Sequence, residues 1–112
     1  SNFSLFMIYY FKRRLIIMDI NILIETAKKA RENAYTPYTN YKVGCALLTK
    51  SGKIFSGCNI ENDGIMSICA ERVAFSKAIS EGEKDFECIL VLGRKRRITI
   101  YLSLWILSTI HD

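Results

Sequence analysis

A cysteine and a glutamate stand two residues apart in the segment Ser67–Phe75, which reads SICAERVAF. The good helix formers that follow Cys69 place this pair in the first turn of a predicted helix. A cysteine at a helix N-terminus faces the positive end of the helix dipole and unpaired backbone N–H groups, which favours the thiolate and makes it a candidate metal ligand. Glu71 could then exchange protons with a water molecule on that metal, as a general acid and base that is not itself a ligand.

The pair alone also has a plainer interpretation. Cys69 could be an ordinary buried cysteine, and Glu71 could be a favourable acid in a first helical turn. The other three cysteines, Cys45, Cys58 and Cys88, fall in β-rich runs beside apolar neighbours and are interpreted as small hydrophobic residues. The surroundings of Cys69 must therefore decide between the two interpretations.

The composition of the chain favours one small domain without a nucleic-acid or membrane partner. Half of its 112 residues are hydrophobic, and its net charge is +5. Between Met18 and Gly93, nine basic residues face ten acidic ones, a net charge of −1, so the excess lies in Lys12–Arg14 and Arg94–Arg97. The apolar N-terminal run precedes its basic residues and is too short to span a bilayer. Four cysteines without a secretory segment favour reduced thiols and a cytoplasmic location.

The spacing of apolar residues predicts the elements that must position the pair. Residues 1–17 are expected to be an N-terminal extension outside the native domain, because a clean helical pattern starts directly after Met18. The expected order from there is α-β-β-α-β in an α/β domain over 18–95. Its elements are a helix over 19–34, a loop over 34–40, two antiparallel strands over 41–50 and 53–61, a helix over 67–82 and a buried strand over 86–93.

Three segments, AYTPYTNYKVG, ALLTKSGKIFSGCNIEN and ICAERVAFSKAISEGEKDFECILVL, resemble the small, tetrameric, zinc-dependent type of cytidine deaminase in order. The resemblance runs from Met18 to about Lys95, and the GCNIEN and CAER motifs carry it. It implies a layered α-β-α fold, truncated here after the third strand. It also implies a homotetramer that hydrolyses cytidine or deoxycytidine to uridine or deoxyuridine in pyrimidine salvage.

The same resemblance implies a role for each matching residue. Cys69 would bind a catalytic Zn²⁺, and Glu71 would move protons between water, the ring nitrogen and the leaving amine. The other matching positions are Arg72, which would donate to the zinc thiolates, Asn59 and Glu61, which would hold the ribose hydroxyls, and Tyr41, which would pack near the pyrimidine. Plainer interpretations remain open: Asn59 as a turn former, Tyr41 as a core aromatic and Arg72 as a solvated helix residue.

The chain departs from the family pattern at the zinc ligands. The family takes two further ligands from a P-C-x-x-C element after the third strand, and no C-x-x-C occurs in these 112 residues. The only histidine, His111, is a lone residue near the C-terminus and is not assigned to metal. The segment Glu61–Cys69 is also one residue shorter than the usual family loop and lacks its aromatic residue.

A shift of reading frame would explain residues 96–112, which we interpret as an aberrant tail. The segment Ser103–His111, SLWILSTIH, can be encoded as TCC CTG TGG ATA TTG TCG ACA ATT CAT. Read one base later, this string translates as PCGYCRQF, which contains the missing motif. The purine-rich codons expected for Arg94–Arg97 are a natural place for the slip.

Two functions follow from these observations. The first is a zinc-dependent cytidine deaminase, with little activity in this chain because two zinc ligands are missing. The second is a non-catalytic remnant that only associates with intact subunits. Zinc content and ammonia release from cytidine distinguish them.

Overall fold

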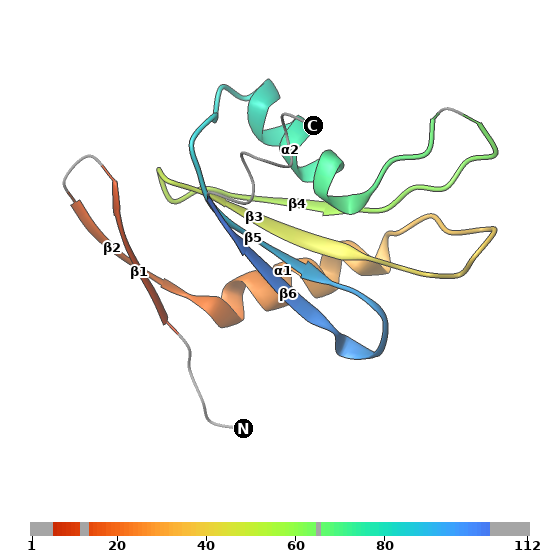
Figure 1. The fold of residues 1–112 in the computed structure, drawn as a ribbon, viewed down its shortest axis with the longest axis horizontal. Helices are drawn as coiled ribbons and strands as arrows, with labels where there is room; N and C mark the ends of the chain where they lie inside the picture. Colours follow the sequence, from red (N-terminus) through yellow and green to blue (C-terminus); the bar gives the residue numbers. More distant parts are fainter. Residues whose placement is uncertain (1–5, 12–13, 65, 104–112) are drawn as a thin grey trace.

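The structure is a computed structural model that describes residues 6–11, 14–64 and 66–103. Within these ranges, four strands form an antiparallel sheet in the order β4-β3-β5-β6, and a separate two-stranded hairpin precedes the first helix (Figure 1). The elements in chain order are β1 (Phe6–Phe11), β2 (Arg14–Asp19), α1 (Ile20–Glu32), β3 (Gly44–Thr49), β4 (Ile54–Cys58), α2 (Ala70–Ser80), β5 (Phe86–Leu92), the 3₁₀ turn η1 (Arg94–Arg96) and β6 (Ile98–Leu102).

Helix α1 begins where the sequence predicts and covers one face of the sheet. The Asp19 carboxylate caps it by accepting a hydrogen bond from the Asn21 backbone N–H at 2.9 Å. The residues that recur at three- and four-residue steps are the ones it buries, and β3 and β5 supply the facing side chains. This first core consists of Ile20, Leu23, Ala27, Ala46, Leu48, Cys88, Leu90 and Leu92.

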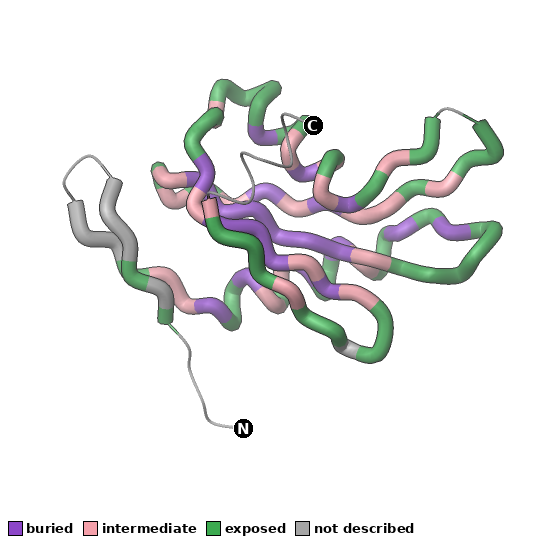
Figure 2. The backbone as a smooth tube through the Cα atoms, in the orientation of Figure 1, coloured by how far each residue is buried: buried purple, intermediate pink, exposed green. Residues whose placement is uncertain are grey.

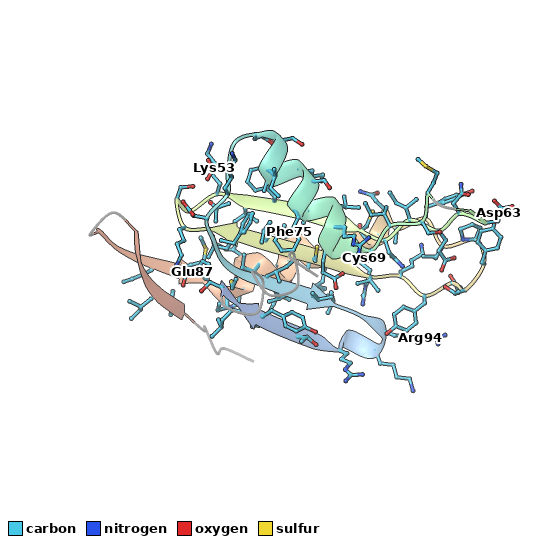
Figure 3. The ribbon with its side chains drawn as sticks, turned by 45° about the horizontal axis from the view of Figure 1, so that its top comes forward. Lys53, Asp63, Cys69, Phe75, Glu87 and Arg94 are labelled. Carbon is cyan, nitrogen blue, oxygen red and sulfur yellow. The ribbon has the colours of Figure 1, made fainter. Side chains whose placement is uncertain are left out.

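Helix α2 covers the opposite face, so the domain has three layers, α-β-α. Successive residues of β3 point to opposite faces of the sheet, and its alternate residues Cys45 and Leu47 therefore join the second core. The ring of Phe75 on α2 meets the ring of Phe86 edge to face, with centroids 5.1 Å apart (Figure 3). This second core consists of Cys45, Leu47, Phe55, Ala70, Ala74, Ala78, Phe86 and Ile89. Figure 2 shows burial concentrated in the middle of the sheet.

The predicted hairpin and buried strand are both confirmed. The strands β3 and β4 pair antiparallel across Ser51 and Gly52, and Gly52 adopts a φ of 93°, which glycine reaches without steric cost. Strand β5, expected over 86–93, is found over Phe86–Leu92 with five of its seven residues buried. The order α-β-β-α-β therefore holds from Ile20 to Leu92.

The described residues contain one strand beyond the predicted order α-β-β-α-β. Strand β6 follows η1 and pairs antiparallel with β5, from Leu92 opposite Ile98 to Cys88 opposite Leu102. Without β6, one edge of β5 would present unpaired N–H and C=O groups, and the β-prone run ITIYL satisfies them. Four of the five β6 residues stay exposed, so this strand forms an open edge (Figure 2).

The N-terminal hairpin was not predicted. It pairs Phe6 with Asp19 and Phe11 with Arg14, so Met18 lies within β2 instead of starting the ordered structure. Figure 1 shows the hairpin projecting away from the sheet. Whether residues 1–17 lie outside the native domain stays a prediction.

Candidate active site

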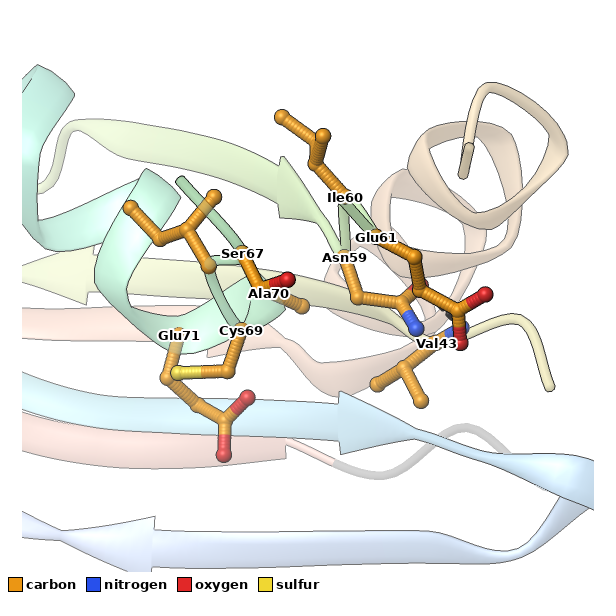
Figure 4. A pocket seen from close by; sticks show the side chains of 9 residues that line it. Val43, Asn59, Ile60, Glu61, Ser67, Cys69, Ala70 and Glu71 are labelled. Atoms are coloured by element: carbon orange, nitrogen blue, oxygen red, sulfur yellow. Dashed lines mark hydrogen bonds between the residues drawn. The ribbon is translucent and has the colours of Figure 1, made fainter. Parts of the chain in front are cut away.

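A pocket lies at one end of the sheet, where the segment after β4 meets the segment before α2. The Ile60 N–H donates to the Ile68 carbonyl and the Ile68 N–H to the Ile60 carbonyl, each at 3.0 Å. This bridge ties the segment after β4 to the segment before α2. A cavity of about 310 Å³ lies beside it, lined by Val43, Asn59, Ile60, Glu61, Ser67, Ile68, Cys69, Ala70 and Glu71 (Figure 4). We call Asn59–Glu61 the strand wall and Cys69–Glu71 the helix wall.

The helix wall presents the thiol and the carboxylate of the CAER motif side by side. Cys69 is the N-cap residue of α2, has an extended backbone and is exposed. Within the part of the chain that the structure describes, its side chain makes no capping hydrogen bond. Glu71 lies in the first turn of the helix and is half-buried. Figure 4 shows both side chains pointing toward the same side of the pocket.

Two residues beneath the helix wall fix where α2 begins. A Cβ added to Gly57 of β4 would lie 2.3 Å from the Ala70 carbonyl oxygen, so only glycine allows the helix to approach the strand this closely. The buried Cys45 thiol donates a hydrogen bond to the same carbonyl oxygen at 3.1 Å. Burial raises the pKa of Cys45, and the neighbouring Glu71 and Cys69 raise it further. Sequence reasoning interpreted Cys45 only as a small hydrophobic residue.

In the strand wall, Asn59 holds the chain entering β3. Its side-chain oxygen accepts from the Val43 backbone N–H at 2.9 Å, and its side-chain nitrogen donates to the Tyr41 carbonyl at 2.8 Å. The backbone N–H of Asn59 also donates to the Val43 carbonyl at 3.2 Å. Asn59 therefore fixes the backbone of residues 41–43 as well as lining the pocket.

Glu61, the second residue predicted in this wall, binds the loop before Tyr41. One carboxylate oxygen accepts from the backbone N–H groups of Tyr38 and Thr39 at 3.0 and 3.1 Å, and the other accepts from the Thr39 hydroxyl. The hydrogen bond from the Thr39 hydroxyl, followed by those from the two backbone N–H groups, lowers the pKa of Glu61. Sequence reasoning missed Thr39, which contacts Glu61 without lining the pocket itself.

The structure does not bring Tyr41 and Arg72 to the pocket. The Tyr41 ring lies outside the pocket lining, with the Arg94 guanidinium 5.8 Å from its centroid (Figure 3). Arg72 is exposed, and its guanidinium forms no hydrogen bond or ion pair within the described residues. The role that the resemblance implies for Arg72 stays a prediction.

The residues around the pocket do not make a complete metal site. Within residues 6–11, 14–64 and 66–103, no three His, Cys, Asp or Glu side chains are grouped so that they could hold a metal ion. Cys69 supplies one exposed thiol, while the Cys45 thiol is buried and already donates to Ala70. His111 lies outside the described residues. A catalytic zinc site takes three protein ligands, so the donors present here do not fit one.

Comparison with known proteins defines the class. Residues 18–100 match the family model described as the cytidine and deoxycytidylate deaminase zinc-binding region, and the chain belongs to this family. It is 51% identical over 77 residues to a cytidine deaminase of Sporosarcina psychrophila, covering 68% of this chain and 57% of the relative. It is 48% identical over 74 residues to a probable cytidine deaminase of Dictyostelium discoideum, covering 65% and 50%. The chain thus spans about half the length of these relatives.

Solved structures give the same result for the fold. A cytidine deaminase from Burkholderia pseudomallei is 33% identical with a TM-score of 0.66, covering 74% of this chain and 91% of that one. A cytidine deaminase from Mycobacterium tuberculosis is 25% identical with a TM-score of 0.70, covering 84% and 77%. The fold and family inferred from the sequence are therefore confirmed. In the described residues, no helix has the length and apolarity needed to cross a membrane.

Proposed function

We propose that the pocket is the nucleoside site of a hydrolytic deaminase of pyrimidine salvage, with cytidine and deoxycytidine as its ligands. One observation carries the proposal: Asn59 and Glu61 line the same cavity as Cys69 and Glu71. An amide and a carboxylate suit the two hydroxyls of a ribose, and a second carboxylate beside a thiol suits proton transfer at the base. Family membership supports this substrate class.

In this proposal, Glu71 moves the protons of the reaction. Water adds to the amine-bearing carbon of the pyrimidine, and Glu71 accepts a proton from it and gives that proton to the ring nitrogen. Glu71 then accepts the proton of the new hydroxyl group and gives it to the amine, and the bond from carbon to this nitrogen breaks as the carbonyl forms. The products are ammonia and uridine or deoxyuridine. The half-buried position of Glu71 in the pocket wall supports this role.

The activity expected of this chain depends on how many zinc ligands it supplies. In the family, zinc activates the attacking water, but the donors around Cys69 do not fit a zinc site, so we derive no step through the metal. We propose that the 112-residue chain binds zinc weakly and turns over little cytidine. Its alternative role is that of a non-catalytic subunit, which family resemblance would place in a homotetramer.

Location and partners complete the proposal. All four cysteines are free, which supports a reducing, cytoplasmic compartment. The near-neutral balance of charges between Met18 and Gly93 supports a small-molecule ligand over nucleic acid.

Calorimetric titration with cytidine, uridine and adenosine tests the ligand class. We expect saturable binding of cytidine that weakens about ten-fold in Glu61→Gln, because the neutral amide is a poorer acceptor for ribose hydroxyls. Glu81→Gln, at the far end of α2, is the matched control and should bind like the parent. Equal binding of adenosine and cytidine, or no binding of cytidine, would contradict the proposal.

A further inference from the structure

Thr39 connects the residues that face the proposed ribose site. Its hydroxyl donates to the Glu61 carboxylate and accepts from the Tyr41 backbone N–H at 3.0 Å. Its own backbone N–H donates to the other Glu61 oxygen at 3.1 Å. Asn59 completes the network by donating to the Tyr41 carbonyl. One threonine thereby ties Glu61 to the segment that Asn59 holds.

The direction of these hydrogen bonds is fixed by the chemistry of the hydroxyl. A threonine hydroxyl has one proton, and the Tyr41 N–H approaches its oxygen, so the proton points to Glu61. One Glu61 oxygen already accepts two backbone N–H groups, while the other accepts only the Thr39 hydroxyl among the described residues. The second oxygen therefore keeps an acceptor position for a donor in the pocket.

The backbone around Thr39 holds the hydroxyl in place. Asn40 adopts a φ of 55°, in the left-handed region that asparagine tolerates better than most residues. Its backbone N–H donates to the Thr36 carbonyl at 3.1 Å, which closes a turn over 36–40. Glu61 is held from the other side, because its backbone N–H donates to the Tyr35 carbonyl at 2.7 Å.

We propose that Thr39 is a positioning residue that orients the Glu61 carboxylate toward the ribose and so sets the preference of the pocket for a nucleoside over a free base. The inference rests on the proposed function, because it takes the ligand to be cytidine. Thr39 is absent from the pocket lining, so it acts through Glu61.

The test compares Thr39→Val with Thr39→Ser. Valine keeps the shape of threonine and removes the hydroxyl, whereas serine keeps the hydroxyl and removes only the methyl group. Thr26→Val is the matched control, since it removes a threonine hydroxyl from α1 that donates to the Ile22 carbonyl at 2.7 Å. Two readouts are measured on each purified protein: the ratio of cytidine to cytosine affinity by calorimetry, and the titration of the Glu61 side-chain carboxyl by ¹³C NMR.

We expect Thr39→Val to reduce the cytidine-to-cytosine affinity ratio about ten-fold, as for the loss of a hydrogen bond to a charged group. Thr39→Ser and Thr26→Val should keep the parent ratio. In the NMR titration, Thr39→Val should raise the Glu61 pKa toward its ordinary value, and Thr39→Ser should keep it low.

The outcomes separate this inference from the proposed function. If the parent prefers cytidine and Thr39→Val has the same ratio, the inference is overturned while the proposed function stands. If the parent does not bind cytidine, the proposed function fails, and the nucleoside preference assigned to Thr39 fails with it. An unchanged Glu61 titration in Thr39→Val would overturn the positioning contact itself, whatever the binding result.

Discussion

The two walls of the pocket differ in how completely their polar groups are satisfied. In the strand wall, the side chains of Asn59 and Glu61 together accept four hydrogen bonds and donate one. The partners in all five are residues 38–43. In the helix wall, the Cys69 thiol makes no capping hydrogen bond, and no group of three metal-binding side chains surrounds it in the described residues. The strand wall is complete within one short stretch of chain, whereas the helix wall needs ligands from elsewhere.

This difference shows how unequally a local change in sequence affects the two halves of a site. The strand wall depends on residues 38–61, all of which lie before the part of the chain that we interpret as aberrant. The helix wall would take two thiolates from an element after β5, in the segment where the resemblance ends. A single shift of reading frame would therefore remove the two further zinc ligands that the family resemblance implies and leave the contacts of the strand wall intact.

Restoring the reading frame should change the difference between the two walls more than any other variant. If codons 94–97 hold one extra base, its deletion would replace the tail with one containing PCGYC and complete the zinc ligands. We expect ammonia release from cytidine to rise more than about 100-fold over the parent, while cytidine affinity changes little. Equal rates of ammonia release from the two proteins would contradict the claim that the helix wall lacks its zinc ligands. Genomic sequencing that shows an uninterrupted frame encoding Leu104 and Trp105 would refute the frame shift itself.

Gly57→Ala should disturb the helix wall more than the strand wall. The added Cβ would lie 2.3 Å from the Ala70 carbonyl oxygen, so the start of α2 must move away from β4. We expect the free energy of unfolding to fall by about 1–3 kcal/mol, measured by urea denaturation. Gly64→Ala is the control, because among the described residues its Cβ would meet only the Asn62 side-chain oxygen, at 3.6 Å. Equal stabilities of the two variants would show that the close approach at Gly57 does not position α2.

The buried thiol of Cys88 should make the fold sensitive to alkaline pH. Burial raises the pKa of Cys88 from 9.0 to about 11. The unfolded chain loses this proton at lower pH, so the stability contributed by the neutral thiol is complete below pH 9.0 and is lost as the pH rises toward 11. Urea denaturation across this range should show a steeper loss for the parent than for Cys88→Ala, by up to about 1.4 kcal/mol per pH unit. Parallel profiles would contradict the assignment.

Arg94→Ala should have the smallest effect. Arg94 lies over the Tyr41 ring at 5.8 Å, and both side chains are exposed. We expect a loss of about 0.5–1 kcal/mol in stability and no change in cytidine affinity, since neither residue lines the pocket. A large loss of cytidine binding would instead indicate that Tyr41 contacts the ligand, as the family resemblance implies.

Local patterns were enough to predict most of the fold. The spacing of Ile20, Leu23 and Ala27 predicted α1, and the pair Ser51–Gly52 predicted the turn between β3 and β4. Strand β6 was missed because the run ITIYL was interpreted as part of a tail. Its pairing partner is the edge of β5, which is far from evident in the local sequence. The hairpin of β1 and β2 was missed because the sequence that connects the two strands contains no clear turn signal.

The candidate site was predictable only where a motif carried it. Cys69 and Glu71 could be placed at a helix start from the sequence, and the structure puts them there. Thr39 and Cys45 could not be found in this way, because their contacts join residues 22 and 25 positions apart. The resemblance implies that Tyr41 packs near the base, and this stays a prediction. In the structure the Arg94 guanidinium lies 5.8 Å from the centroid of its ring, and Tyr41 is not among the residues that line the pocket.

The zinc content of the purified 112-residue protein, measured by elemental analysis after dialysis against a weak chelator, tests the central claim most directly. Cytidine binding is measured on the same sample, so that the two walls are compared in one protein. The account predicts saturable cytidine binding with far less than one zinc per chain. A stoichiometric, tightly held zinc would contradict it, because a single thiol at position 69 could not then be the only ligand.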